Sequence, residues 1–339
     1  MHTMHPAFRP VRLALLLWAC LLSRPTSAQL DKGSQCLLDF HVHTDSLYEA
    51  KAWAEGIRLY ECSQTQRRFD LHPNDRYWAA CFYAKAGKCA QALEVMRTLV
   101  GTYHYRDVWA LQDTDFVECR KMPDWQALET RIRTAHDSVA QLATRWQPLS
   151  DSLQTIGQTD QGVRQVFADP AVFPALSKAQ QDSVYTVIGY QDSLNLLAVT
   201  TVLDRYGWVN AALISDEASS ALFLVIQHAP KAVIEKYLPL LRAAVRKGAA
   251  DARDLAWMED RLSMYRYKPQ RYGSQMVQLK KDKSGYKQGI TYVYEVEDPA
   301  YLDCRRATIN VPPMVAYLKM VYNQDGAPFM PAVVYKAVQ

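Results

Sequence analysis

The sequence lacks any apolar segment long enough to cross a lipid bilayer as a helix. Its longest uninterrupted apolar run, Leu13–Leu22, holds about ten residues, whereas a membrane-spanning helix needs about 20. The sequence therefore predicts no transmembrane segment, and the mature protein is expected to be soluble.

The same short apolar run is typical of a secretory signal peptide. Two arginines precede it, and the small residues Thr26–Ala28 follow it at the position where signal peptidase cleaves. We expect residues 1–28 to be removed and a bacterial-type protein to be exported, either to the periplasm or to the outside. A less favoured alternative is lipoprotein processing at Cys20, because Leu17–Cys20 loosely resembles a lipobox.

Strong charge and the common catalytic motifs are also lacking. Three arginines of the predicted signal peptide account for most of the formal net charge of +4, so the mature chain is nearly neutral and no nucleic-acid partner is predicted. No nucleophile elbow, phosphate-binding glycine loop, HExxH motif or dinucleotide fingerprint occurs. No cofactor and no metal site are predicted, and enzymatic activity stays an open question.

Six cysteines follow the predicted cleavage site, an even number that an oxidising compartment would allow to pair. They are Cys36, Cys62, Cys81, Cys89, Cys119 and Cys304. Complete pairing would require one bridge from the N-terminal region to Cys304, and the alternative is that several are buried free thiols. No pair has the CxxC spacing of a redox or zinc site, so no connectivity is assigned.

The N-terminal part has the pattern of paired helices. Ser46–Glu49 reads as a capping box that starts a helix of about fifteen residues, and two further amphipathic helices meet at Gly87. The second pair resembles a tetratricopeptide repeat in its small and bulky residues, which are Ala80, Tyr83, Gly87, Ala92, Met96 and Leu99. The resemblance implies a repeat-like helical domain over residues 29–148 that contacts a protein or peptide.

The pattern breaks around Trp146–Ser150, and we place the start of a second domain, residues 149–339, there. Apolar periodicity and helix stops predict four helices in it, at 182–206, 217–228, 230–247 and 251–267. Segments 276–279 and 290–296 are rich in β-branched and aromatic residues and predict a β-hairpin, which a short helix after Pro313 follows. The predicted fold class is mainly α, with a repeat-like N-terminal domain and a second helical domain that carries a small β-hairpin.

One short motif suggests metal chemistry. On a strand, alternate residues of Asp39–Asp45 would face one side, so His41 and His43 could converge on a metal. The motif resembles the first strand of metal-dependent phosphoesterases of the polymerase-and-histidinol-phosphatase type and of amidohydrolases. The further ligands of those families lack a matching pattern here, and we favour a polar lead-in to the first helix.

A second constellation extends over most of the second domain. It comprises Asp160, Arg164, Asn195, Tyr206-Gly207-Trp208, Gln227-His228-Ala229, Asp260-Arg261 and Pro269–Gln275. In this order the residues resemble a bacterial domain family of unknown function that often follows a repeat-like helical region. The resemblance covers about Leu153–Tyr317, and Ser274 stands where threonine is expected. It implies the domain but brings no established activity.

The helical pattern carries several of these polar groups inward. Asn195 lies on an apolar stripe and His228 ends a helix that is apolar on nearly every side, and a buried unpaired amide or imidazole costs about 1–3 kcal/mol. We therefore expect each to have a polar partner nearby. Asp260 and Arg261 are expected to serve different neighbours, one of which is the backbone of residues 270–275.

Two interpretations of this constellation stay open. In the functional one, His228 is a general acid or base, Arg261 with Arg164 binds an anionic or carbonyl group, and Asp260 belongs to the catalytic candidates. The remaining binding candidates orient the substrate, and they are Asn195, Gln227, Gln270, Tyr272 and Gln275. In the structural one, the same groups form a satisfied polar network that fixes helix packing.

Three functional hypotheses follow from the sequence. The leading one is an exported binding protein without catalytic activity. The alternative is a hydrolase-type enzyme with its site around His228 and Arg261. A distant third is a metal-dependent phosphoesterase that uses His41 and His43.

Overall fold

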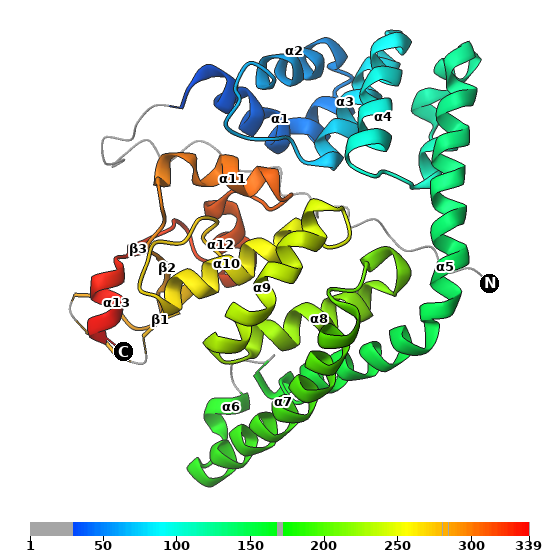
Figure 1. Ribbon diagram of the computed structural model, residues 1–339. Helices are drawn as coiled ribbons and strands as arrows, with labels where there is room; N and C mark the ends of the chain where they lie inside the picture. The colour runs from blue at the N-terminus through cyan, green and yellow to red at the C-terminus, as the bar shows by residue number, and fades with distance from the viewer. Residues whose placement is uncertain (1–29, 168–171, 280, 284, 339) are drawn as a thin grey trace.

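The computed structural model describes residues 30–167, 172–279, 281–283 and 285–338 (Figure 1). The predicted signal peptide and Cys20 lie outside the described residues. Within those residues the chain is mainly helical with one small sheet, which confirms the predicted fold class. No helix in the described part is both long and apolar enough to span a membrane.

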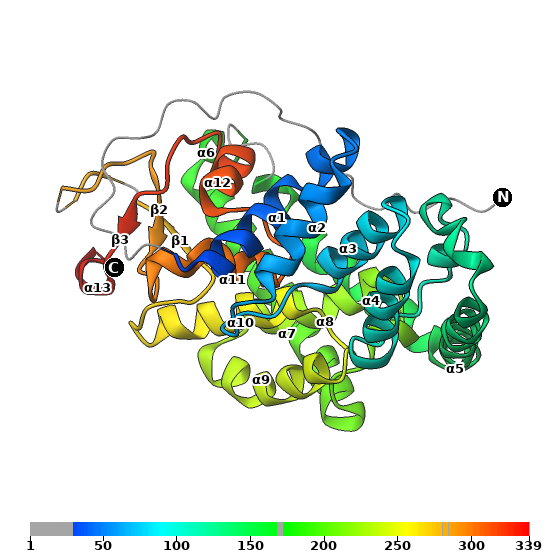
Figure 2. The same ribbon diagram turned by 90° about the horizontal axis from the view of Figure 1, so that it is seen from above.

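The N-terminal region consists of two helix–turn–helix pairs that lie beside one another (Figure 2). The four helices are α1 (Lys32–Glu49), α2 (Trp53–Ser63), α3 (Pro73–Lys85) and α4 (Cys89–Thr102). The second pair meets at Gly87 as predicted, with a φ of +74° that glycine adopts without steric cost. The small residues Ala80 and Ala92 are fully buried, and so are Met96 and Leu99, so small side chains bring the helices together while large ones fill the core.

The predicted capping box at Ser46–Glu49 is wrong, because these residues form the last turn of α1 rather than the start of a helix. The Ser46 hydroxyl donates to the His43 carbonyl one turn earlier, at 2.9 Å. The helix begins instead at Asp31, whose carboxylate accepts from the Ser34 amide. Apolar residues of α1 then recur with helical spacing on its buried face, and this period prevails over the short alternating motif.

Two disulfides join neighbouring elements of this region. Cys36–Cys62 links α1 to α2, and Cys89–Cys119 links α4 to a 3-10 turn at Cys119–Lys121. Cys81 and Cys304 are buried free thiols. The sequence left open whether all six cysteines pair or several stay as free thiols. In the structure four of them pair and two stay free.

Helix α5 (Pro123–Gly162) is continuous through Trp146–Ser150, the segment where the sequence pattern breaks. Pro148 lies inside it, although proline removes one backbone donor and disfavours a helix interior. The first half of α5 packs on α4 and its second half packs on α8 (Figure 1). The helix therefore connects the two halves of the chain directly, without a linker.

Four further helices surround a second core, in which Leu153 of α5, Leu222, Ile234, Leu241 and Met258 are fully buried. They are α7 (Lys178–Tyr206), α8 (Asp216–His228), α9 (Lys231–Arg246) and α10 (Ala252–Tyr265), and the short α6 (Val172–Ala175) precedes them. All four long helices lie where the sequence predicts them.

The predicted hairpin is formed by β1 (Met276–Gln278) and β2 (Thr291–Tyr294), with Val277 opposite Tyr292 in antiparallel register. A third strand, β3 (Phe329–Met330), adds to β2 in parallel. Its two residues are too few to show a period of two, so this strand could not be predicted from the sequence. Three short helices complete the chain, namely α11 (Leu302–Thr308), α12 (Met314–Tyr322) and α13 (Ala332–Val338).

Helix α11 lies against α1, although the two are far apart in sequence (Figure 1). Its Cys304 and Ala307 are part of the hydrophobic core of the N-terminal region. The guanidinium of Arg68 lies 3.9 Å from the centre of the Tyr301 ring, which extends the contact. Because α11 covers this side of α1, a peptide cannot bind there, and the predicted peptide contact would need another surface of the N-terminal region.

Candidate functional site

Four ionisable side chains meet where α5, α7 and α8 converge, and we call them the Asp160 cluster: Asp160, Arg164, Asp192 and His228. The side chain of Asp160 is 1% exposed, and its carboxylate lies 3.4 Å from Nδ1 of His228 and 3.3 Å from Nη1 of Arg164. Arg164 reaches on to Asp192, with Nη2 2.7 and 2.9 Å from the two carboxylate oxygens. One guanidinium therefore joins two carboxylates from different helices.

The electrostatics of the cluster favour the ionised form of Asp160. Burial raises the pKa of Asp160, but the hydrogen bond and charge of His228, together with Gln161 and Arg164, outweigh burial and leave the pKa below its usual value. His228 is half-buried. The imidazole is thus oriented by a buried carboxylate, an arrangement that general bases use and that helix junctions also use.

Asn195 lies one turn beyond Asp192 on α7 and is 3% exposed, so the expected inward orientation is confirmed. Its Oδ1 accepts hydrogen bonds from the Thr159 hydroxyl at 3.1 Å and from Gln191 Nε2 at 2.9 Å. Its Nδ2 is buried without a hydrogen-bond partner among the described residues. Asn195 therefore extends the polar contact between α5 and α7.

A second group surrounds the buried carboxylate of Asp260 on α10, which is 0% exposed. Its oxygens accept from the backbone amides of Arg271 at 2.7 Å, of Tyr272 at 3.1 and 3.2 Å, and of Ser274 at 3.0 Å. Burial raises the pKa of Asp260, and these amides oppose the rise. The expected contact between Asp260 and the backbone of residues 270–275 is confirmed.

The glutamines of the same loop bond to the loop itself and to the sheet. Gln270 is fully buried, and its Nε2 donates to the Gln275 and Tyr294 carbonyls, both at 2.9 Å, while its Oε1 accepts from the Gln275 amide at 2.8 Å. Gln275 Nε2 donates to the Ser274 hydroxyl. These two glutamines, which were predicted to bind substrate, therefore hold the loop against β2. The hydrogen bonds of their side chains are made to groups of the protein itself.

Two adjacent arginines on α11 complete this anchor, and the sequence interpretation missed them. Arg306 is fully buried and donates to the Pro312 carbonyl at 2.7 Å and to the Tyr272 carbonyl at 2.8 Å. Arg305 donates to the Arg271 carbonyl at 2.6 Å. The available signal was a pair of adjacent arginines in a stretch that also carries the apolar residues Leu302, Ala307 and Ile309. We call Asp260, Gln270, Arg305 and Arg306 the loop anchor.

A family of unknown function, DUF6624, matches residues 148–328, which is more than half of the chain. The chain belongs to this family. The match includes the Asp160 cluster and the loop anchor, and it agrees with the resemblance that the sequence motifs indicated. Neither the curated proteins nor the solved structures contain a match to the chain.

Within the DUF6624 domain, the two remaining predicted site residues do not join the Asp160 cluster by any hydrogen bond or ion pair among the described residues. Gln227 Nε2 lies 3.5 Å from the Trp257 carbonyl, and its buried Oε1 has no partner. Arg261 lies near Tyr335 of α13, where its positive charge opposes the burial that raises the tyrosine pKa. His228 and Arg261 thus face different neighbours, which does not favour a shared site.

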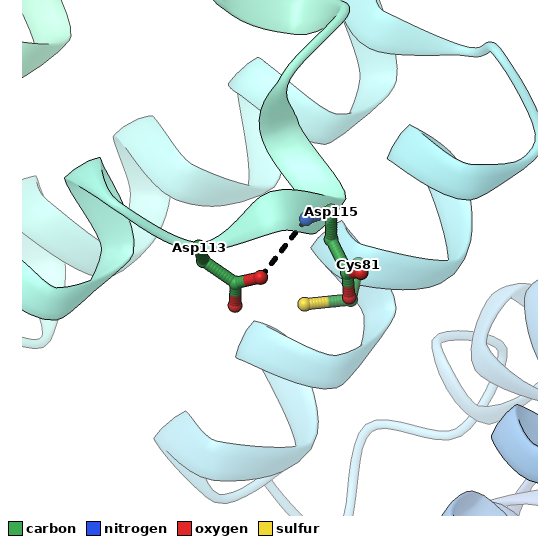
Figure 3. A group of neighbouring side chains, drawn as sticks. All are labelled: Cys81, Asp113 and Asp115. Atoms are coloured by element: carbon green, nitrogen blue, oxygen red, sulfur yellow. Dashed lines mark hydrogen bonds between the residues drawn. The ribbon is translucent and has the colours of Figure 1, made fainter.

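Outside the DUF6624 domain, Cys81, Asp113 and Asp115 place their sulfur and oxygen atoms within 4.8 Å of one another (Figure 3). Both carboxylates accept hydrogen bonds from groups of the protein. Asp113 accepts from the Asp115 amide at 2.9 Å and from the Tyr77 hydroxyl at 2.6 Å, and Asp115 accepts from the Tyr48 hydroxyl at 2.6 Å. Burial and both carboxylates raise the pKa of the Cys81 thiol. Cys81, Asp113 and Asp115 therefore contribute to the packing of the helices. The sequence did not indicate this group, because Cys81 lies far from the two aspartates in the chain.

The motif Asp39–Asp45 lies inside α1, so the favoured interpretation as a polar lead-in before the first helix is wrong, and so is the alternative of a strand. Residues two apart on a helix point roughly 200° apart, so His41 and His43 do not converge. Nδ1 of His41 lies 3.1 Å from both oxygens of Asp75 on α3, an ordinary contact between helices. The geometry that motivated the phosphoesterase hypothesis is absent from this part of the chain.

Two cavities in the described part of the chain stand out, and no predicted site residue lines either of them. One, of about 400 Å³, lies over residues 63–76 between α2 and α3. The other, of about 190 Å³, lies between α8 and α10 of the DUF6624 domain. Asp254 lines the second cavity, and burial together with the charge of Asp251 raises its pKa to about 7.

This raised pKa predicts a pH dependence of stability. The pKa of Asp254 is about 7 in the folded protein and about 3.9 when unfolded, so the folded state binds this proton more tightly. Its contribution to stability is fully present below about pH 4 and is lost as the pH rises through 7, with about 2–3 kcal/mol lost between pH 5 and 8. Urea denaturation of wild type and Asp254→Asn across this range should show the difference, whereas parallel curves would contradict it.

Proposed function

We propose that this chain is an exported binding protein that associates with a second copy of itself through the outward face of α7. The observation that carries the proposal is a row of large apolar side chains exposed on this helix. Its members are Val187, Tyr190, Leu194 and Leu197. Tyr190 is 69% exposed and Leu197 is 68% exposed, which is unusual for a row of such residues on a helix of a soluble monomer.

The spacing of the row favours a helix as the occupant. Its members follow one another at intervals of three, four and three residues, which is the pattern of a coiled-coil seam. The row lies on the side of α7 opposite the buried residues Asn195, Val199 and Leu203. An apolar seam of this kind packs on the seam of another helix.

The lack of charge on α7 favours an apolar partner. Between residues 183 and 203 the helix carries one charged residue, Asp192, and Arg164 pairs with it on the inner side. An exposed helical face normally carries charged residues. A partner that binds here loses almost no hydration of charged groups.

The symmetry of the row favours a second copy of this chain. A two-fold axis that crosses α7 at the level of Asp192 would pair Val187 with Leu197 of the other copy, and Tyr190 with Leu194. Each of these contacts occurs twice, as a closed two-fold interface requires. The row therefore complements itself in the antiparallel direction.

The disulfides support the exported location, because cysteines stay reduced in the cytosol. As part of the proposal, we keep the division of the mature chain into residues 29–148 and 149–339. The hydrolase alternative is not favoured, because His228 and Arg261 have separate neighbours.

The mass in solution tests the proposal, by light scattering or sedimentation over a range of concentrations. Wild type is expected to form a dimer. The double substitution Tyr190→Glu and Leu197→Glu places four charges in the interface of the dimer and should raise the dissociation constant at least about 100-fold.

The control is Leu142→Glu, which introduces one glutamate per chain at an exposed leucine of α5 and should leave the dimer intact. Circular dichroism of each variant checks that the helices persist. A monomeric wild type at every accessible concentration would overturn the proposal, and so would a dimer that the double substitution leaves unchanged.

A further inference from the structure

The cavity between α8 and α10 combines an apolar wall with two opposite charges. Phe223, Leu224 and Ser220 line it from α8, and Arg253, Asp254 and Trp257 line it from the first turns of α10. Phe223 is buried and Trp257 is half-buried, so both rings are held by the surrounding core. None of these residues belongs to the outward row of α7.

Asp254 is a sheltered carboxylate that accepts no hydrogen bond from any residue that the structure describes. Its side chain is 16% exposed, and the closest cation, Nε of Arg253, lies 4.0 Å from its Oδ1, which is too far for a hydrogen bond. Sheltered carboxylates in proteins are nearly always hydrogen-bonded, because leaving one unpaired costs free energy. A ligand that brings N–H donors would supply the missing bonds.

Arg253 is the second charged group, and it lies at the mouth of the cavity. Its side chain is 56% exposed, and its Nη2 lies 3.4 Å from Asp251, a loose contact that leaves most of its N–H donors free. The two charges therefore lie side by side at one end of an apolar space. A ligand with a positive and a negative group on the same carbon atom would match both.

We propose that this cavity binds a small zwitterion of the amino-acid type, with its ammonium on Asp254, its carboxylate on Arg253 and an aliphatic side chain between Phe223 and Trp257. The ring faces add a cation–π attraction for the ammonium. The cavity of about 190 Å³ is smaller than the 300–1,000 Å³ of sites for drug-sized ligands. Its occupant is therefore a single small molecule rather than a peptide.

Protonation of Asp254 would oppose this binding. The charged groups that face it are Asp251, which caps α10, and Arg253 in the first turn of α10. Asp251 is also close to His72, which caps α3, and the lining residues of α8 are uncharged. Since burial and Asp251 raise the pKa of Asp254 to about 7, binding at pH 6 should release a proton and should be weaker than at pH 8.

Titration calorimetry of the full mature chain with L-leucine and its two half-ligands tests the site. The half-ligands are 3-methylbutylamine, which lacks the carboxylate, and 4-methylpentanoate, which lacks the ammonium. Leucine should bind wild type at least about tenfold more tightly than either half-ligand. Buffers with different ionisation enthalpies should reveal the proton released at pH 6.

Two variants that each remove one charge separate the two charged contacts. Asp254→Asn should remove the advantage of leucine over 4-methylpentanoate, and Arg253→Gln should remove its advantage over 3-methylbutylamine. Glu259→Gln, farther along α10 and paired with Arg242, is the control and should bind as wild type does. Failure of wild type to bind leucine at millimolar concentration would overturn the proposal, as would an unchanged affinity in Asp254→Asn.

Discussion

Replacing Asp260 with alanine is expected to lower the free energy of unfolding by about 3–5 kcal/mol, because the change leaves buried donors without an acceptor. Three backbone amides, those of Arg271, Tyr272 and Ser274, donate to this one carboxylate. The charge of Arg306 also lies close enough to interact with Asp260. Asp303, which is half-buried, is the other carboxylate that interacts with Arg306, so loss of Asp260 would leave this arginine with only the more exposed of its two countercharges.

The substitution Asp260→Asn sharpens this prediction. It keeps the shape of the side chain but replaces one acceptor oxygen with an NH₂ group that would face backbone N–H donors. We expect a loss of the same order as for alanine, since the new amide cannot accept on both sides. A small effect of Asp260→Asn would show that the charge and the second acceptor are dispensable.

Urea denaturation followed by circular dichroism measures both variants. Glu259→Gln is the matched control, because the neighbouring carboxylate pairs with Arg242 at the surface and such pairs are worth about 0–1 kcal/mol. If Asp260→Ala lowers stability no more than this control does, the loop anchor does not hold the domain together.

The sequence predicted the helices of the second domain because their apolar residues repeat over several turns. The contact of Asp260 with residues 270–275 could also be predicted. Asp260 points away from the apolar face of its helix, and residues 270–275 come soon after that helix ends. Helical periodicity determines which residues point inward. It therefore located Asn195 in the interior correctly.

Long-range pairing was beyond the sequence. The spacing of His228 and Arg261 gave no sign that the first would face Asp160 and the second Tyr335. Such partners depend on how whole helices pack, which no local period encodes. For the same reason, the sequence left the pairing of the cysteines open.

Short motifs misled where a longer period competed with them. The alternation in Asp39–Asp45 suggested a strand, and Ser46–Glu49 suggested a helix start, yet both lie inside α1. The buried residues Cys36, Leu37, Phe40 and Thr44 share one face of that helix. Burial of that face stabilises the helix more than a local capping preference stabilises an alternative start.

Reduction of the two disulfides is expected to remove most of the stability of the N-terminal region. Each bridge closes a loop with a sequence separation of 26 or 30 residues, and loop-closure entropy gives about 3.5 kcal/mol for each. Together they amount to about 7 kcal/mol, against a typical total of about 5–15 kcal/mol. The mature chain should therefore lose its thermal transition, or show it at much lower temperature, when a strong reductant is present.

Alkylation of the unfolded, unreduced protein followed by mass spectrometry provides the companion measurement. Two thiols of the mature chain, Cys81 and Cys304, should be labelled, and the other four cysteines should react only after reduction. The control is a variant with serine at those four positions, in which reductant has no bond to break and should not shift the transition. If wild type kept its full stability once all six thiols were free, the bridges would be dispensable for the fold and would no longer support folding in an oxidising compartment.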